Sequence, residues 1–264
     1  NYAMGGVDVR GYHAANLLLH AGSALLLFGI LRRTFSRGSP ENDRPGFPRW
    51  VEDQATVLAA GIAALWASHP LQTASVSYIS QRTELLMAFF YLMALYAFVR
   101  SRDAAPVAWR SVSAVACWLG MMCKESMVTA PVLILLYDTL FSAGQLTRAL
   151  RERWRYYAAL AASWILLAAL MMDVRQRAVG FGLGVSSWQY LLTEGEAIVT
   201  YLLRIVWPHP LIFDYGAIFY DGSVRAVACV VVSSSLLAVA AVLFWKRSRP
   251  GFAASRFGAS CLRG

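Results

Sequence analysis

The chain has 264 residues, of which 58% are hydrophobic and 15% charged, and its mean hydropathy is +0.49. This apolar content excludes an ordinary water-soluble domain of the same size. The net charge of +9 does not indicate a nucleic-acid-binding protein, because the basic residues gather in short connections beside apolar segments rather than on one face of a domain.

Seven apolar segments predict an all-α fold, a polytopic bundle of about seven transmembrane helices. In chain order the segments are residues 12–31, 55–68, 85–99, 111–123, 127–142, 157–172 and 226–245. The first has 20 residues and as a helix would rise ~30 Å, the thickness of the hydrocarbon core of a bilayer. The shorter segments need flanking tryptophan, tyrosine and polar residues to complete a crossing.

Residues 111–142 contain two apolar stretches separated by Lys124 and Glu125. They can form one long helix that buries these two residues, or a hairpin with the two residues at its tip. Pro131 discourages an unbroken helix, because its ring clashes with the preceding turn. Each arm is short for a full crossing, so a re-entrant pair is a further alternative. The hairpin is favoured because a single span would place the arginines of 148–155 outside.

Residues 187–207 predict an amphipathic helix on the outer surface rather than a further span. Ser187 can cap this helix, and polar residues recur at spacings of three and four along one of its faces. They are Gln189, Thr193, Glu196, Thr200 and Arg204. As a span the helix would turn Lys246 and Arg247 outward, so we place it in the outer interface, where the polar face meets headgroups or solvent.

Arginine-rich connections alternate with basic-poor ones and indicate the orientation of the chain. Four connections, after the first, third, fifth and last segments, hold 15 of the 24 Lys and Arg residues. Basic loops are retained on the cytoplasmic side, so the chain is predicted to begin outside and end inside, in the inner membrane of the cell. An external start suggests a missing upstream span, and we expect the chain to be a fragment. Residues 250–264 predict an unstructured tail.

Polar side chains in the outer connections are candidates for binding a lipid phosphate. Arginine presents a fixed fork of donors to phosphate, and lysine binds it as a point charge. The candidate cations are Arg82, Lys124 and Arg204, supported by His69, Gln81, Glu84, Glu125, Glu196, His209 and Asp214. The structural alternatives are that Arg82 and Glu84 only flank a span, and that Lys124 only caps a helix or pairs with the adjacent carboxylate. For the helix 187–207, the structural alternative is that its polar residues only form a solvent-exposed or headgroup-facing side with no role in binding.

Other polar residues in the apolar segments predict packing rather than chemistry. His13, Asn16 and His20 share one helix face and predict hydrogen bonds between helices, since a metal site would need a third strong ligand nearby. Asp138 is expected to meet the arginines that follow its segment. The four cysteines show no metal spacing and predict no disulfide.

Several short motifs occur in a fixed order along the chain. They are residues 1–3 and 11–17, then 69–73 (HPLQT) and 78–82 (YISQR), then 124–125 with 129–131 and 136–138, and finally 196–199 with 207–208 and 213–216. At these motifs the chain resembles bacterial membrane proteins related to the TMTC-type O-mannosyltransferases, over about residues 1–245.

The resemblance implies a GT-C-type fold that transfers a sugar from a polyprenyl-phosphate donor to a protein or glycan acceptor on the outer face. The donor, the acceptor and membrane lipids are then the partners. It also implies an inverting displacement. A carboxylate activates the acceptor hydroxyl, while cations, with or without a divalent metal, stabilise the departing phosphate.

The residue that would act as this carboxylate is left unassigned. Relatives carry an acidic catalytic residue early in their first outer loop, and often C-terminal tetratricopeptide repeats, and neither region is present here. Asp8 lies at the wrong end of that loop, and Ala74 stands where relatives tend to have an acid.

Two other classes of function stay open at this stage. A non-catalytic membrane anchor or scaffold would keep the helical bundle and present a repeat domain to partners. A transporter is suggested by Lys124, Glu125 and the histidines, but transporters commonly show two related halves with broken helices, and the sequence shows no such duplication.

Overall fold

The computed structural model describes residues 9–37, 47–78, 81–103, 105–176, 186–212 and 223–248, and these ranges contain only helices and their connections. The prediction of an all-α fold is therefore confirmed. The chain forms two compact units, residues 1–170 with 248–264, and residues 171–247. The predicted tail 250–264 lies outside the described residues.

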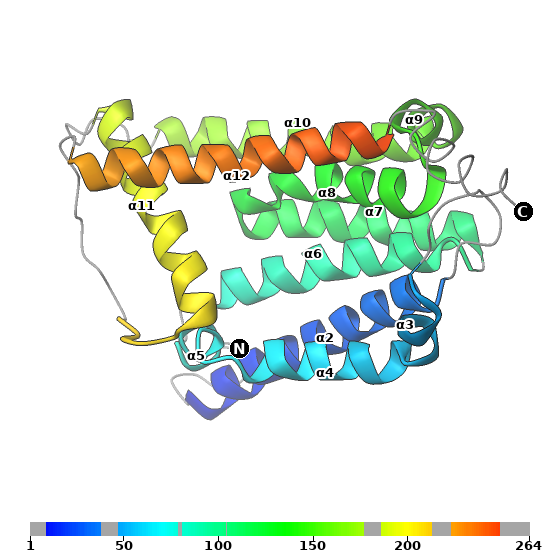
Figure 1. The fold of residues 1–264 in the computed structure, drawn as a ribbon, viewed down its shortest axis with the longest axis horizontal. Helices are drawn as coiled ribbons and strands as arrows, with labels where there is room; N and C mark the ends of the chain where they lie inside the picture. Colours follow the sequence, from blue (N-terminus) through cyan, green and yellow to red (C-terminus); the bar gives the residue numbers. More distant parts are fainter. Residues whose placement is uncertain are drawn as a thin grey trace, which may run out of the picture. The chain divides into compact units, whose positions relative to one another are not determined.

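The first unit is built on long helices that run back and forth beside one another (Figure 1). α2 packs against α4 and α6, and α6 packs against α7. In chain order the elements are α2 (Val9–Phe35), α3 (Arg49–Asp53), α4 (Ala55–Ser68), α5 (Gln72–Ser77), α6 (Arg82–Arg100), α7 (Pro106–Cys123), a 3-10 helix (Glu125–Thr129), α8 (Ala130–Asp138), a π-helical turn (Thr139–Ala143), α9 (Leu146–Glu152) and α10 (Trp154–Gln176).

The hydrophobic core of this unit lies between α6, α7, α8 and α10. Phe98, Met121, Ile134 and Leu160, one from each of these helices, are fully buried. The ring of Phe98 also stacks on that of Tyr156, with 5.6 Å between the ring centroids. Close packing of this kind is a main source of helix association in a membrane, where the lipid is as apolar as the side chains.

Polar side chains of α2 bind the chain segment that leads to α6. Nδ2 of Asn16, which is fully buried, donates a hydrogen bond to the carbonyl of Val76 at 3.2 Å. Nε2 of His20 lies 2.9 Å from the carbonyl of Ala67 at the end of α4. The predicted hydrogen bonds between elements are thus confirmed for these two residues, and they join α2 to α5 and to the end of α4.

Five helices among the described residues are long and apolar enough to cross a membrane. They are Val9–Phe35, Arg82–Arg100, Glu125–Ala143, Trp154–Met172 and Val224–Lys246. The prediction of seven is therefore wrong. The predicted span 55–68 is α4, whose 14 residues rise only ~21 Å. The predicted span 111–123 lies in α7, whose first half carries Arg110 and two serines that lower its hydropathy.

The helix breaks at Lys124, so the alternative of one continuous helix over 111–142 is wrong. α7 ends at Cys123, and Lys124 has the extended dihedral angles φ −160° and ψ 146°. Met127 then folds back onto α7, where a Cβ added to Gly120 would lie 2.7 Å from the methionine sulfur. Pro131 sits in the first turn of α8, where its missing N–H costs no hydrogen bond.

The second unit contains α11 (Ser187–Val206) and α12 (Val224–Ser248). Ser186, not the predicted Ser187, caps α11 by accepting a hydrogen bond from the amide of Gln189 at 3.2 Å. α11 and α12 meet at Gly195, where an added Cβ would lie 3.1 Å from backbone atoms of Val230. α11 is not among the candidate spans, as predicted, and its place in the outer interface stays a prediction.

Candidate functional site

Arg82 begins α6 with donors that no described residue uses. Its guanidinium carbon lies 4.9 Å from the centroid of the Tyr12 ring on α2. Nε and Nη2 are buried and have no hydrogen-bond partner within the described ranges. A guanidinium stacked on a ring keeps its in-plane donors available, and buried donors normally find an acceptor. Nε and Nη2 of Arg82 are therefore donors still without an acceptor among the described residues.

Lys124 contacts Glu84, which stands in the first turn of α6. The ion pair joins Nζ of the lysine to Oε1 of the carboxylate, and the two side chains are 31% and 32% exposed. The alternative pairing of Lys124 with Glu125 is wrong, because Lys124 reaches Glu84 on another helix and Glu125 is exposed. The structure thus brings together two connections that the sequence suggested independently, and we call this region the Arg82 end of the bundle.

The two cations approach the start of α6 from different sides. Residues two apart in a helix do not share a face, so Arg82 lies toward α2 while Glu84 meets Lys124 from the end of α7. Gln81, the N-cap residue of α6, makes no capping hydrogen bond with its side chain. The first N–H groups of a helix lack partners within it and carry the positive end of its dipole. Two cations therefore flank a helix end that itself favours an anion.

The remaining predicted residues of the Arg82 end have local or exposed positions. His69 ends α4, and its Nδ1 accepts a hydrogen bond from the amide of Leu71 at 3.3 Å. Gln81 immediately precedes α6 and donates its backbone N–H to the carbonyl of Tyr78 at 3.2 Å. Tyr12, beneath Arg82, is a residue that the sequence analysis missed. Its signal was its place in the first turns of the first helix, at the end where α6 begins.

The other predicted site residues belong to the second unit. Glu196, which is buried, pairs with Nε of Arg225 at 3.1 Å, and Nη1 of Arg204 donates to the carbonyl of His209. Asp214 lies outside the described residues. Since Arg204 and Arg82 are in different units, their joint action on one phosphate stays a prediction.

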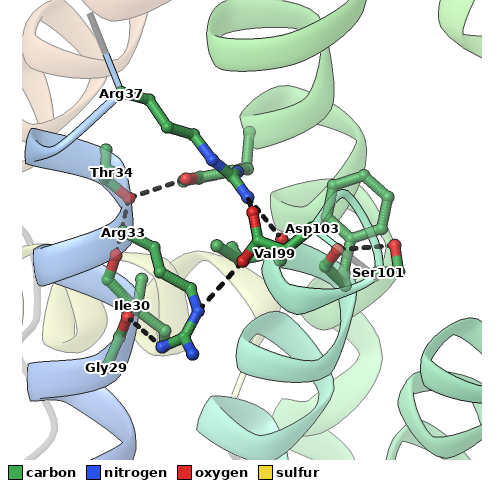
Figure 2. A network of polar contacts seen from close by, with 10 residues as sticks. Gly29, Ile30, Arg33, Thr34, Arg37, Val99, Ser101 and Asp103 are labelled. Atoms are coloured by element: carbon green, nitrogen blue, oxygen red, sulfur yellow. Dashed lines mark hydrogen bonds and ion pairs between the residues drawn. The ribbon is translucent and has the colours of Figure 1, made fainter. Parts of the chain in front are cut away.

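At the opposite end of α6, a polar network that the sequence analysis did not predict joins α2 to the turn after α6 (Figure 2). Asp103 accepts a hydrogen bond from Nε of Arg33 at 3.2 Å and also pairs with Arg37. Arg37 donates in addition to the carbonyl of Val99 at 3.1 Å. The usable signal was the run of arginines after the first apolar segment, which lies at the same predicted end as Asp103 in the connection after the third.

Asp138 meets the arginine cluster as predicted. Its carboxylate is fully buried, and Nη1 of Arg153 lies 3.0 Å from its Oδ2. The hydroxyl of Tyr157 donates to the same oxygen at 2.7 Å. A buried carboxylate needs such partners, so this contact is structural and fastens α8 to α10.

The described residues do not form a metal site. Across these ranges no group of three or more His, Cys, Asp or Glu side chains lies close enough together to hold a metal ion.

Apolar helices of membrane-crossing length define a multi-pass membrane protein. No family model matches the chain, and no solved structure matches it. The protein O-mannosyl-transferase Tmtc2 of Drosophila melanogaster is 26% identical over 232 residues, which are 82% of this chain and 22% of that protein. Tmtc1 of the same species is 30% identical over 148 residues, 55% of this chain and 15% of that protein. TMTC4 of Homo sapiens is 28% identical over 146 residues, 53% and 19% of the two proteins.

The chain is thus a distant homologue of the TMTC protein O-mannosyl-transferases over part of its length. It spans about a fifth of the length of these relatives. The homology suggests a membrane glycosyltransferase-like protein, in agreement with the motifs in the sequence.

Proposed function

We propose that this chain is part of a membrane glycosyltransferase that moves a sugar from a polyprenyl-phosphate donor to a protein or glycan acceptor. Arg82 and Lys124 bind the donor phosphate over the start of α6. The observation that carries the proposal is the half-buried guanidinium of Arg82. Its Nε and Nη2 are buried without an acceptor among the described residues, beside a helix start that the side chain of the N-cap residue Gln81 does not cap. The distant homology to protein O-mannosyl-transferases supports the same class of reaction.

The reaction is a displacement at the anomeric carbon of the sugar. The acceptor hydroxyl forms a bond to this carbon and loses its proton to a carboxylate, while the bond to the donor phosphate breaks and its electron pair leaves with the phosphate. Arg82, Lys124 and the first amides of α6 stabilise the negative charge that develops on the leaving oxygen. Glu84 is paired with Lys124, and the carboxylate that takes the proton is left unassigned.

The proposal places the Arg82 end outside the membrane and the arginines of α9 inside, as basic loops require. Single cysteines at Glu125 and Arg148, both exposed, test it in a chain whose native cysteines are replaced. In intact cells a membrane-impermeant maleimide should label the cysteine at Glu125 and spare the one at Arg148. The reverse labelling pattern would show the opposite transmembrane orientation and contradict a phosphate site on the outer face.

Binding of farnesyl phosphate to the purified protein in detergent tests the phosphate site. Arg82→Ala should weaken binding by roughly 10- to 100-fold, because a hydrogen bond to a charged group contributes about 1.5–3 kcal/mol. Lys124→Ala should weaken binding too, since it also leaves the Glu84 carboxylate uncompensated next to the phosphate. Glu84→Ala should tighten binding, because it releases Lys124.

Arg148→Ala is the matched control, since it removes an exposed arginine from the opposite end of the bundle. Its affinity for farnesyl phosphate should equal that of the unchanged protein. Equal affinity in the Arg82 and Lys124 variants as well would show that the donor phosphate binds elsewhere.

A further inference from the structure

A pocket with three arginines lies at the opposite end of α6 from Arg82, where that helix ends and α7 begins. Its volume is ≈ 380 Å³. Among the residues that line it are Ser101, Arg102, Asp103, Arg110, Ser142 and Arg153, and we call it the Arg102 pocket. The 19 residues of α6 separate it from the Arg82 end by ~27 Å. It is therefore a different site from the one that the proposed function uses.

The acids around the pocket are already neutralised by other arginines. Asp103 in the lining is bound by Arg33 at the end of α2 and by Arg37, which follows that helix (Figure 2). Arg153 in the lining is bound to the buried Asp138. Each of these acids is thus paired directly with an arginine other than Arg102 and Arg110.

Arg102 and Arg110 consequently have donors that the described part of the chain does not satisfy. Nη1 of Arg102 and Nε of Arg110 are buried without a hydrogen-bond partner in that part. Burial, followed by the positive charge of Arg37, lowers the pKa of Arg102 from its ordinary value. An arginine stays protonated even so, and cannot relieve the strain by losing its proton. A bound anion would supply acceptors for these donors and compensate the charges.

The chemistry of the pocket favours a phosphate group. Two guanidinium forks match the oxygens of phosphate, which they bind through paired hydrogen bonds. The hydroxyl of Ser101 donates to the carbonyl of Phe98 at 2.7 Å, so Ser142 is the hydroxyl that can add a donor. The volume exceeds that of one phosphate, so it also admits the group to which the phosphate is attached.

We propose that the Arg102 pocket binds a phosphate group through Arg102 and Arg110. Two sources can supply that group, an anionic lipid headgroup or a free phosphate. Lipid headgroups are available to the pocket, because α6 is a candidate span and its C-terminal end would lie at the headgroup level of the membrane. Basic pockets between membrane helices are known to bind such headgroups.

The test is native mass spectrometry of the full chain in neutral detergent, titrated with short-chain phosphatidic acid. Arg102→Gln with Arg110→Gln should weaken binding by at least 10- to 100-fold, through the loss of charge-assisted hydrogen bonds. Arg151→Gln is the control, because it removes an exposed arginine of α9 at the same end without touching the pocket. All variants are also made with Arg82→Ala, so that lipid bound at the Arg82 end does not contribute.

Inorganic phosphate distinguishes the two sources. If it displaces phosphatidic acid at similar concentration, the pocket takes a free phosphate; if it does not compete, the pocket takes the lipid headgroup. Both results support the site. A double variant that binds phosphatidic acid as well as Arg151→Gln would overturn it.

The melting temperature separates lost binding from lost folding. Arg102 and Arg110 have no acid partner to lose in the described ranges, so the double variant should melt no lower than the unchanged protein. Phosphatidic acid should raise the melting temperature of the unchanged protein and of Arg151→Gln, but not that of the double variant. A double variant that is still stabilised by the lipid would equally overturn the proposal.

Discussion

Replacement of Arg153 by methionine is expected to lower the free energy of unfolding by about 3–5 kcal/mol, because it leaves a buried carboxylate without its counter-charge. Asp138 is 0% exposed, and Tyr157 would remain as its hydrogen-bond donor. For a chain of this length the loss corresponds to a fall in melting temperature of roughly 10 °C. Thermal unfolding of the purified protein in detergent measures it.

The exposed pair in the same region is the control for this stability prediction. Arg148 binds Glu152 at 2.7 Å, one turn along α9, with side chains 51% and 40% exposed. Arg148→Met should therefore leave the melting temperature unchanged, since solvent screens such pairs. Asp138→Leu together with Arg153→Met should recover much of the lost stability, because no buried charge is then left alone. A single Arg153 variant as stable as the Arg148 variant would contradict the buried pair.

Lys124→Glu is expected to have the largest effect on ligand binding. It would set a second carboxylate against Glu84 at the start of α6, where the helix dipole and Arg82 otherwise favour an anion. Affinity for farnesyl phosphate should fall by roughly 100-fold or more, since a charge-assisted contact is lost and a repulsive one is gained. The like charges should also lower the melting temperature.

The charge swap Glu84→Lys with Lys124→Glu distinguishes a broken contact from general damage. The swapped residues can pair again with opposite polarity, so the double variant should regain the melting temperature that the single variant loses. Pairing Lys124→Glu with Glu152→Lys, a distant exposed change of the same sign as Glu84→Lys, should bring no recovery. Equal melting temperatures in the two double variants would mean that Lys124 and Glu84 do not touch.

Hydropathy and charge in the sequence predict much of this fold. They indicate which segments are helical, but not which side chains contact one another. The apolar runs correctly predict the helices α2, α6, α10 and α12. They wrongly predict α4 and α7 as membrane spans, since a short or partly polar helix can pack in a bundle without the length or hydropathy of a span.

The partners within the site depend on packing, which these patterns do not contain. Arginine content predicted that the connection before α6 and the Lys124 tip share one end, and the contact with Glu84 agrees with this. It could not predict that Lys124 prefers Glu84 to its neighbour, because that depends on how α6 packs against the end of α7. It also treated Arg102 and Arg110 only as markers of a loop, although the turn between the two helices gathers them around one pocket.

Asn16 sets a limit on how α2 can change. Asn16→Leu would make the segment more hydrophobic and, by its free energy of transfer from water to lipid alone, a better membrane anchor. The amide, however, ties the approach of α6 to α2, and its position is fully enclosed. Asn16→Leu would therefore raise the hydropathy of α2 but remove the hydrogen bond to Val76, shortly before the proposed phosphate site at the start of α6.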